Sequence, residues 1–99
     1  MIKKTKATMH RGSPRVWLQG APEMTAAGFT AKARYSITYN ADNITLVIER
    51  DGKRGVSDCA RGAVLDIGGK KLRAYDFTGG VNWQFMQNKI VITQGVKLC

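Results

Sequence analysis

Two runs of alternating side chains, residues 34–40 and 44–50, constrain the fold of this chain more than any other feature. Within each run, apolar residues occupy every second position, which is typical of β-strands with one buried face. The residues between the runs, Asn-Ala-Asp-Asn at 40–43, are mostly of types that tolerate the backbone of a tight turn. We therefore predict an antiparallel hairpin with one apolar face.

A strand and a short helix are expected before this hairpin. Residues 15–19 form the predicted strand, and Pro22 suits the first turn of a helix because an N–H there would have no partner. Gly28 is typical of the residue that follows a helix end, and Phe29 should return the chain to the core. Residues 15–51 therefore form one strand–helix–hairpin unit.

The same unit recurs in residues 63–94, after a connector at 52–62. A shift of 48 residues aligns large apolar positions, namely Met24 with Leu72, Phe29 with Phe77, Tyr35 with Trp83, and Ile37 with Phe85. After the hairpin turn, a shift of 46 residues aligns Ile44 with Ile90 and Leu46 with Ile92. Any chain with this element order resembles itself when shifted. Here the phenylalanine after the helix and both hairpins agree together, which favours a true repeat.

Each half is too short to bury its own sheet. Two halves that face each other would close a small barrel and remove exposed sheet edges. The predicted fold is therefore mainly β with short helices, a single domain over residues 15–95 that forms a small closed barrel from two β-α-β-β half-repeats. Its predicted core comprises Phe29, Tyr35, Ile37, Leu46, Phe77, Trp83, Phe85 and Ile92.

Residues 1–14 are predicted to be a flexible basic tail. They hold Lys3, Lys4, Lys6 and Arg11, no acidic residue and no apolar periodicity. No apolar run follows them, so they do not form a secretory signal. The sequence also contains no run of about 20 apolar residues, the length that a membrane-spanning helix requires. We expect a cytoplasmic protein with no membrane partner.

The charge of the chain points to an anionic partner. Sixteen lysines and arginines stand against seven acidic residues, a net charge of +9. Such an excess raises the local concentration of polyanions, which makes DNA the first expected partner, RNA the second and an acidic host protein the third. The alternative explanation is that the excess of positive charge serves only to keep the protein soluble.

The candidate nucleic-acid-binding residues are the basic side chains around the predicted helices and the connector. They are Arg15, Lys32, Arg34, Lys53, Arg54, Arg61, Lys70, Lys71 and Arg73. Trp17 and Trp83 could stack on bases, although the alternation around Trp83 favours a place in the core. The Gly-Gly-Lys-Lys sequence at 68–71 lacks the spacing of a phosphate loop but could present an anion site at a helix start.

No enzyme site is evident in the sequence. His10 is the single histidine and falls in the predicted tail, so we expect no histidine-based catalysis and no metal site. Cys59 and Cys99 lack metal-ligand spacing, and we expect neither a disulfide nor a cofactor. Asp66 stands alone in an apolar strand, where a hydrogen bond to a turn is the more common role.

An ordered set of residues resembles the pattern of a known family: Trp17, then Gly20, then the tripeptide Ala27-Gly28-Phe29. The half-unit resembles the SpoVT/AbrB-like, or swapped-hairpin, barrels, and its motif resembles the SymE-like toxin proteins. The span from Pro14 to Gln94 is also similar to an N-terminal region of some phage and prophage cytosine methyltransferases. In that region, Leu65-Asp66-Ile67 matches the corresponding strand of the second half. The catalytic domain of those methylases is absent.

The resemblance implies a barrel that family members usually build from two chains and that one chain would build here as a pseudo-dimer. It also implies DNA binding, in transcription regulation or as an antitoxin. Our leading hypothesis is a small non-enzymatic DNA-binding protein of phage or mobile-element type, monomeric or homodimeric. Two alternatives stay open: a phage-encoded inhibitor of a host defence or regulatory protein, and a SymE-like RNA-cleaving toxin.

Overall fold

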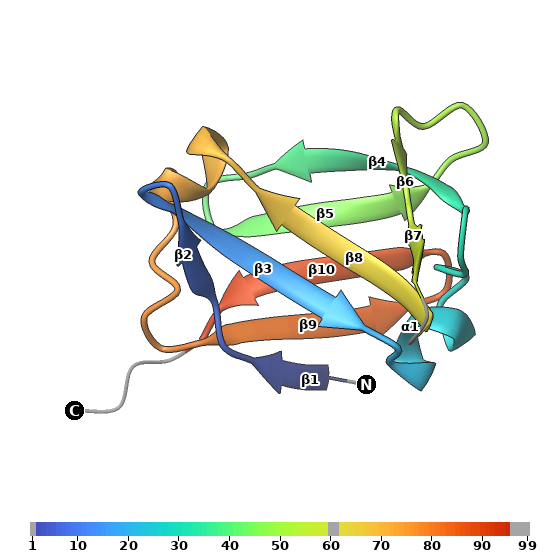
Figure 1. Cartoon of the computed structure of the whole chain (residues 1–99), viewed down its shortest axis with the longest axis horizontal. Helices are drawn as coiled ribbons and strands as arrows, with labels where there is room; N and C mark the ends of the chain where they lie inside the picture. Colours follow the sequence, from blue (N-terminus) through green and yellow to red (C-terminus); the bar gives the residue numbers. More distant parts are fainter. Residues whose placement is uncertain (1, 60–61, 96–99) are drawn as a thin grey trace.

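Two antiparallel sheets make up the computed structural model, which describes residues 2–59 and 62–95 (Figure 1). The strands are β1 (Ile2–Thr5), β2 (Thr8–His10), β3 (Ser13–Gln19), β4 (Arg34–Tyr39), β5 (Asn43–Ile48), β6 (Arg54–Gly55), β7 (Ser57–Cys59), β8 (Gly62–Gly68), β9 (Val81–Met86) and β10 (Lys89–Gln94). The helices are α1 (Pro22–Ala26) and the 3₁₀-helix η1 (Lys70–Ala74). The prediction of a mainly β chain with short helices is confirmed. Within the described ranges, no helix has the length and apolar character needed to cross a membrane.

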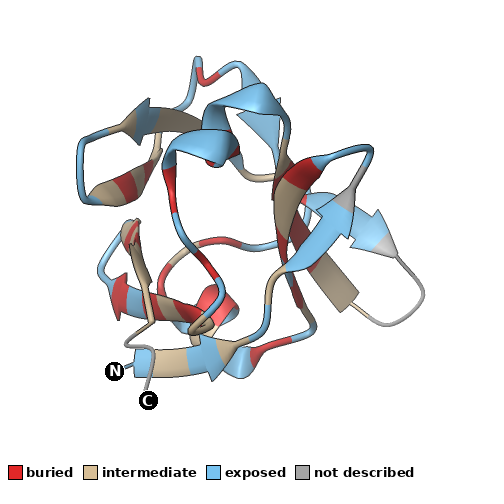
Figure 2. Ribbon diagram, turned by 90° about the vertical axis from the view of Figure 1, so that its left-hand side faces the viewer, coloured by how far each residue is buried: buried red, intermediate tan, exposed pale blue. Residues whose placement is uncertain are grey.

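The six-stranded sheet has the order β1-β9-β10-β5-β4-β6, and the four-stranded sheet has the order β2-β3-β8-β7. In Figure 1, β3 and β8 cross diagonally in front of β5 and β10. Buried residues occur in strands of both sheets and alternate with more exposed ones along the chain (Figure 2). This alternation is expected where only one face of each sheet packs on a core.

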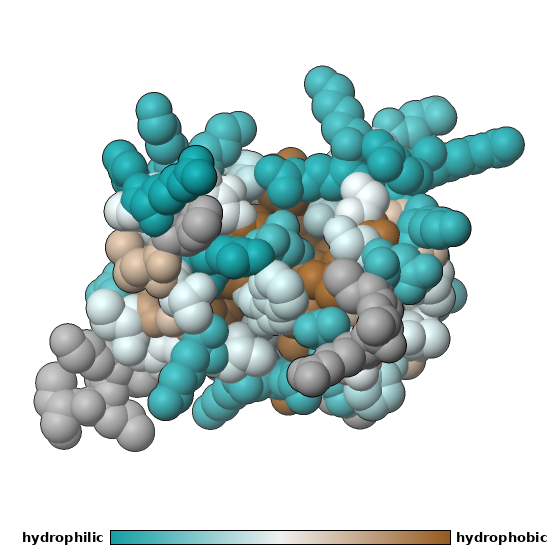
Figure 3. Space-filling view, in the orientation of Figure 1, coloured by the Kyte–Doolittle hydropathy of each residue, from teal (hydrophilic) through white to brown (hydrophobic). Residues whose placement is uncertain are grey.

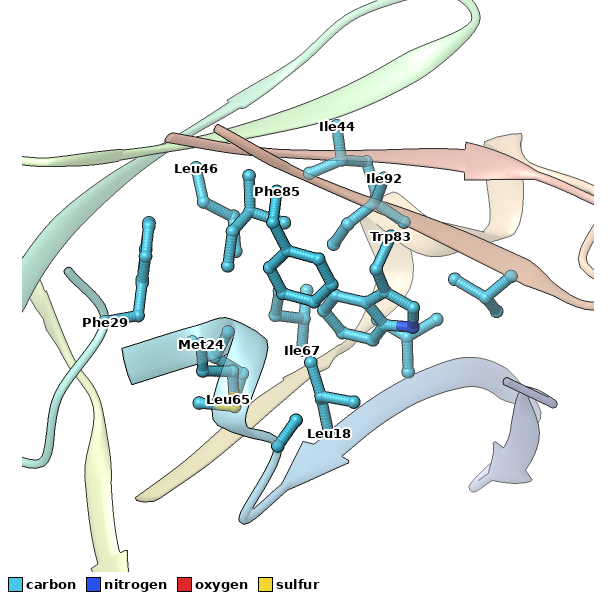
Figure 4. Packing of buried hydrophobic residues seen from close by; sticks show 14 of the residues in the cluster. Leu18, Met24, Phe29, Ile44, Leu46, Leu65, Ile67, Trp83, Phe85 and Ile92 are labelled. Atoms are coloured by element: carbon cyan, nitrogen blue, oxygen red, sulfur yellow. The ribbon is translucent and has the colours of Figure 1, made fainter. Parts of the chain in front are cut away.

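The core lies between the two sheets, with Trp83 and Phe29 as its largest fully buried side chains (Figure 4). Phe29 packs on Tyr35 with ring centroids 5.8 Å apart. Seven of the eight predicted core residues are buried, and Ile37 is only half-buried. The alternation therefore identified the inner face correctly, and the exception lies on β4 where the core opens to solvent.

The two halves of the chain are arranged symmetrically. If each of β1–β5 is exchanged with the strand five places later, β6–β10, both sheets keep the same strand order, read from the opposite edge. The central pairs follow the same exchange, since Leu46 lies opposite Ile90 and Ile44 lies opposite Ile92. In the other sheet, Val16 lies opposite Ile67 and Leu18 opposite Leu65. The exchange also relates β1 to β6 and β2 to β7, strands that lie outside the half-repeats set at 15–51 and 63–94.

The prediction of a flexible tail over residues 1–14 was wrong for the strands β1 and β2. β1 pairs with β9 along its whole length, and the indole Nε1 of Trp83 donates a hydrogen bond to Thr5 Oγ1 at 2.8 Å. β2 forms a hairpin with β3. These strands are held by backbone hydrogen bonds to a sheet edge, which lysine-rich sequences can make without any apolar pattern.

The predicted closed barrel is not found among the described strands, which pair into two separate sheets. β6 pairs with β4 only at Arg34 and Tyr35. The chain enters β6 from the turn at residues 49–52, which packs on Tyr35 and does not continue along β4. Residues 36–39 of β4 thus have no ladder partner on that edge within the described part of the chain. We call this unpaired edge of β4, which lies near the end of β8, the open seam.

The turn before β6 packs closely on β4. The Gly52 carbonyl accepts a hydrogen bond from Arg34 Nε at 2.9 Å, and its N–H donates to the Glu49 carbonyl at 3.0 Å. A Cβ added at Gly52 would lie 2.5 Å from the backbone carbonyl of Tyr35, closer than such atoms can approach. Glycine is therefore required here by space.

Gly52→Ala should lower the free energy of unfolding by about 1–3 kcal/mol, because the backbone of β4 must move to admit the methyl group. Gly55→Ala is the matched control. Its Cβ would meet Nη1 of Arg34 at 2.9 Å, the end of a flexible side chain that can move. We expect the control to change stability by less than about 0.5 kcal/mol. Urea denaturation measures both, and equal losses would contradict the packing described.

Candidate nucleic-acid interface

Two adjoining pockets collect most of the basic side chains expected to bind nucleic acid. The first, which we call the arginine pocket, has a volume of about 570 Å³ and is lined by Arg11, Ser13, Pro14, Arg15, Asp66, Gly68, Gly69, Lys70 and Arg73. The second, which we call the seam pocket, has a volume of about 510 Å³ and is lined by Ile37, Tyr39, Lys53, Arg54, Gly68, Lys70 and Lys71. The pockets share Gly68 and Lys70, so their linings adjoin. Figure 3 shows hydrophilic side chains projecting along the upper edge of the molecule, above η1 and above β6, with apolar surface between them.

The turn between β2 and β3 places Arg11 at the arginine pocket. His10 pairs with Ser13, so the turn consists of two residues, Arg11 and Gly12, whose φ angles are 52° and 81°. This is the hairpin turn in which both residues adopt left-handed backbone, and Asn-Gly is the favoured pair. An arginine held there costs on the order of 1 kcal/mol, and such strain is concentrated at functional sites.

Hydrogen bonds fix two of the guanidinium groups of this pocket. Arg73 Nε donates to Oγ of the buried Ser13 at 2.9 Å, which ties η1 to the start of β3. Arg15 donates from Nε and Nη2 to the two carboxylate oxygens of Asp66, at 2.7 and 2.6 Å. These bonds raise the pKa of Arg15, which keeps its charge. Side chains fixed in this way lose less entropy when they bind an anion.

Asp66 and Trp17 lie on the outer face of the four-stranded sheet, beside Arg15. Asp66 is exposed between the buried Leu65 and Ile67, so the alternation of β8 turns it outward. The Arg15 guanidinium lies 4.7 Å from the centre of the Trp17 ring. Asp66 occupies the bidentate edge of Arg15 that a phosphate would use, so it competes with an anion for that residue.

The seam pocket lies at the open seam of β4. Tyr35, Ile37 and Tyr39 share one face of this strand, with Tyr35 buried and the other two only half-buried. Burial raises the pKa of Tyr35, while the charge of Arg54 acts in the opposite direction. The Lys71 ammonium lies 4.9 Å from the centre of the Tyr39 ring. The pocket therefore combines an aromatic wall with a basic rim.

The anion site predicted at the helix start rests on charge alone. η1 is a 3₁₀-helix of five residues, too short for a helix dipole to add much. Lys70 and Lys71 supply the positive charge, and Gly69 adopts a φ of 112° that lets the chain turn into η1. A phosphate would be held here by side chains rather than by the helix end.

A third pocket occupies the equivalent place in the other half of the molecule. It has a volume of about 380 Å³ and is lined by Glu23, Ala26, Ala27, Phe85, Met86 and Gln87. By the shift of 48 residues, Phe85 corresponds to Ile37, Gln87 to Tyr39 and Glu23 to Lys71. Glu23 also lies 3.9 Å from the Lys3 ammonium. The fold thus offers two equivalent openings, and only one is lined by basic side chains and a half-buried tyrosine.

Six of the nine predicted binding residues line the two basic pockets: Arg15, Lys53, Arg54, Lys70, Lys71 and Arg73. Lys32 and Arg34 do not line them. Lys32 lies in an exposed loop with a φ of 69°, and Arg34 is turned toward the Gly52 carbonyl. Arg61 lies outside the described residues. Lys32 and Arg34 therefore do not share these pockets with the basic residues of η1.

Two lining residues with side chains suited to binding, Arg11 and Tyr39, were not among the predicted nucleic-acid-binding residues. Arg11 was assigned to the tail, because Arg-Gly is not among the pairs typical of a two-residue hairpin turn and its neighbours show no strand pattern. Tyr39 belongs to the alternating run at 34–40, which predicted a strand with one buried face, but nothing in the sequence showed that this face leaves the core before the strand ends. Trp83 is fully buried, and Trp17 remains the more exposed tryptophan at 40%.

No protein-family model, no curated protein and no solved structure matches this chain. The SpoVT/AbrB-like and SymE-like resemblance therefore stays a prediction. Within residues 2–59 and 62–95, no group of three His, Cys, Asp or Glu side chains is arranged to hold a metal ion.

Arg11→Asn should change stability and anion binding in opposite directions. Asparagine tolerates left-handed backbone better than arginine, so the free energy of unfolding should rise by up to about 1 kcal/mol. The loss of one positive charge at the pocket should lower the salt concentration that elutes the protein from heparin, a polyanion. Urea denaturation and heparin chromatography measure the two effects. A destabilised variant, or one with unchanged elution, would contradict a functional reason for arginine in this turn.

Proposed function

We propose that this chain is a small, non-enzymatic DNA-binding protein that holds the phosphate backbone at the arginine and seam pockets. One observation carries the proposal. Seven basic residues from four separate segments line these adjoining pockets, and the single acidic residue among them, Asp66, is paired with Arg15. Unless an anion binds, so many like charges in one place repel each other.

Phosphate contacts of this kind give affinity without reading sequence. Arginine can contact a phosphate through two N–H groups. Arg73 is held by the bond from its Nε to Ser13, which leaves its two Nη groups for a phosphate, whereas a phosphate must displace Asp66 to contact Arg15 in this way. Lys53, Lys70 and Lys71 are exposed and contribute as mobile point charges. The proposal therefore predicts binding with a strong salt dependence and limited sequence preference.

The two-half strand order supports the pseudo-dimer of SpoVT/AbrB-like type that we propose as the finer description of the fold. A pseudo-dimer joins two halves within one chain, and here the central strands of both sheets come from different halves, β5 with β10 and β3 with β8. The corresponding role is that of a DNA-binding regulator of phage or mobile-element type, acting in the cytoplasm.

Fluorescence polarisation with labelled DNA at rising salt tests the proposal. Lys70→Gln should lower affinity for every DNA sequence and reduce the slope of log K against log salt by about one, because one phosphate contact is lost. Lys32→Gln is the matched control, since it removes the same charge from an exposed position outside both pockets.

The control should leave the slope close to that of the wild type. Equal effects of the two substitutions would show that net charge rather than the pockets determines binding. Affinity that stays flat as salt rises would contradict phosphate binding altogether.

A further inference from the structure

We propose that the seam pocket binds the base of an unpaired nucleotide, so that the DNA taken by this chain is single-stranded. This inference rests on the proposed function, because the same basic residues would hold the phosphates. It goes further in naming where a base would lie and which form of DNA fits.

The wall of the seam pocket is an extension of the protein core. Along β4, Tyr35 is 2% exposed, whereas Ile37 and Tyr39 on the same face are half-buried and line the pocket. This face is uncovered because β6 stops pairing with β4 after Tyr35. An aromatic ring and an aliphatic side chain are thus left open at the seam, beside four basic residues.

The size and chemistry of the pocket suit a nucleotide. Its volume of about 510 Å³ lies within the range of about 300–1,000 Å³ that is usual for small-molecule sites. Aromatic rings next to a basic groove are the common solution for binding single strands, because every base has a flat face that can stack. Lys53, Arg54, Lys70 and Lys71 would meet the phosphates on either side of the base.

The place of Tyr39 favours an unpaired base over a duplex. In a duplex the faces of the bases are covered by their neighbours, and only their edges can be reached in the grooves. A half-buried ring on the inner face of a sheet cannot reach a stacked base without extrusion of that base, which costs energy in a duplex and little in a single strand. A duplex would contact only the basic side chains at the rim.

Lys71 gives the pocket a way to admit a base. Its ammonium lies 4.9 Å from the centre of the Tyr39 ring while the side chain is exposed to solvent. Cation–π contacts at exposed sites are weak, so a base can displace the ammonium from the ring. The displaced Lys71 would then lie beside the phosphate of the same nucleotide.

The opening in the other half provides an internal comparison. There, Gln87 takes the place of Tyr39 and Glu23 the place of Lys71. An amide offers no stacking face comparable with a phenol ring, and a carboxylate repels a phosphate. Phe85 lines that opening as part of the buried core, so the half-buried ring of Tyr39 and the positive charge are what distinguish the seam pocket.

Three fluorescent probes of equal length test the proposal by polarisation: a single-stranded DNA, an abasic strand with the same phosphates, and a duplex. The wild type should bind the single strand more tightly than the abasic strand or the duplex. Tyr39→Ala should weaken binding of the single strand by about tenfold, the usual cost of removing one stacking aromatic. It should leave binding of the abasic strand unchanged, which also shows that the variant is folded. Tyr39→Phe should bind as the wild type does.

Trp17→Ala separates this proposal from stacking on the outer face of the four-stranded sheet. If Trp17→Ala rather than Tyr39→Ala removes the preference for the single strand, the seam pocket is not the base site and the proposal is overturned. Equal, salt-dependent binding of all three probes would overturn it too, while leaving phosphate binding intact. Absence of binding to any probe would overturn the proposed function as well.

Discussion

The pairing of β5 with β10 and of β3 with β8 is the constraint on which the rest of the structure depends. Each pairing joins one half of the chain to the other at the centre of a sheet. Neither half could bury its apolar faces alone, because a hairpin and one further strand make too small a core. Joined in this way, the halves place Trp83, Phe29 and Met24 between two sheets, out of contact with solvent. The N-terminal strands then attach to the edges, as β1 does beside β9 and β2 beside β3.

The exchange of halves has a consequence for function. A fold built twice from one unit has two equivalent openings, and here the side chains at those openings have diverged. One is lined by Phe85 and Gln87 and carries the acidic Glu23, whereas the other carries Tyr39 and a set of lysines and arginines. The apolar positions that hold the sheets together agree between the halves, while the surface positions do not. The packing explains the fold, and the difference between the openings explains why binding should occur on one side only.

The sequence predicted the parts of the fold that depend on local pattern. β4, β5, β9 and β10 were expected because a half-buried strand alternates its side chains, and each is present. β1 and β2 were missed because they are held through their backbone at sheet edges, which leaves no pattern in the side chains. The closed barrel was expected from the symmetry of the halves, but the shortness of β6 depends on how the turn at residues 49–52 packs on β4, which no local pattern reveals. The same reason applies to the binding surface: the basic residues of η1 were expected, whereas the contributions of Arg11 and Tyr39 depend on a turn and an edge that form only in three dimensions.

The most direct test is to map the backbone amide signals that shift in NMR spectra when a short DNA strand is added to the labelled protein. The account predicts that the shifted signals belong to the turn between β2 and β3, to residues 52–55, to residues 37–39 and to residues 68–73. Signals from α1 and from residues 85–87, at the equivalent opening, should stay in place. Shifts centred on α1 and residues 85–87, or spread evenly over both openings, would contradict the claim that the divergence of the two halves determines where this protein binds.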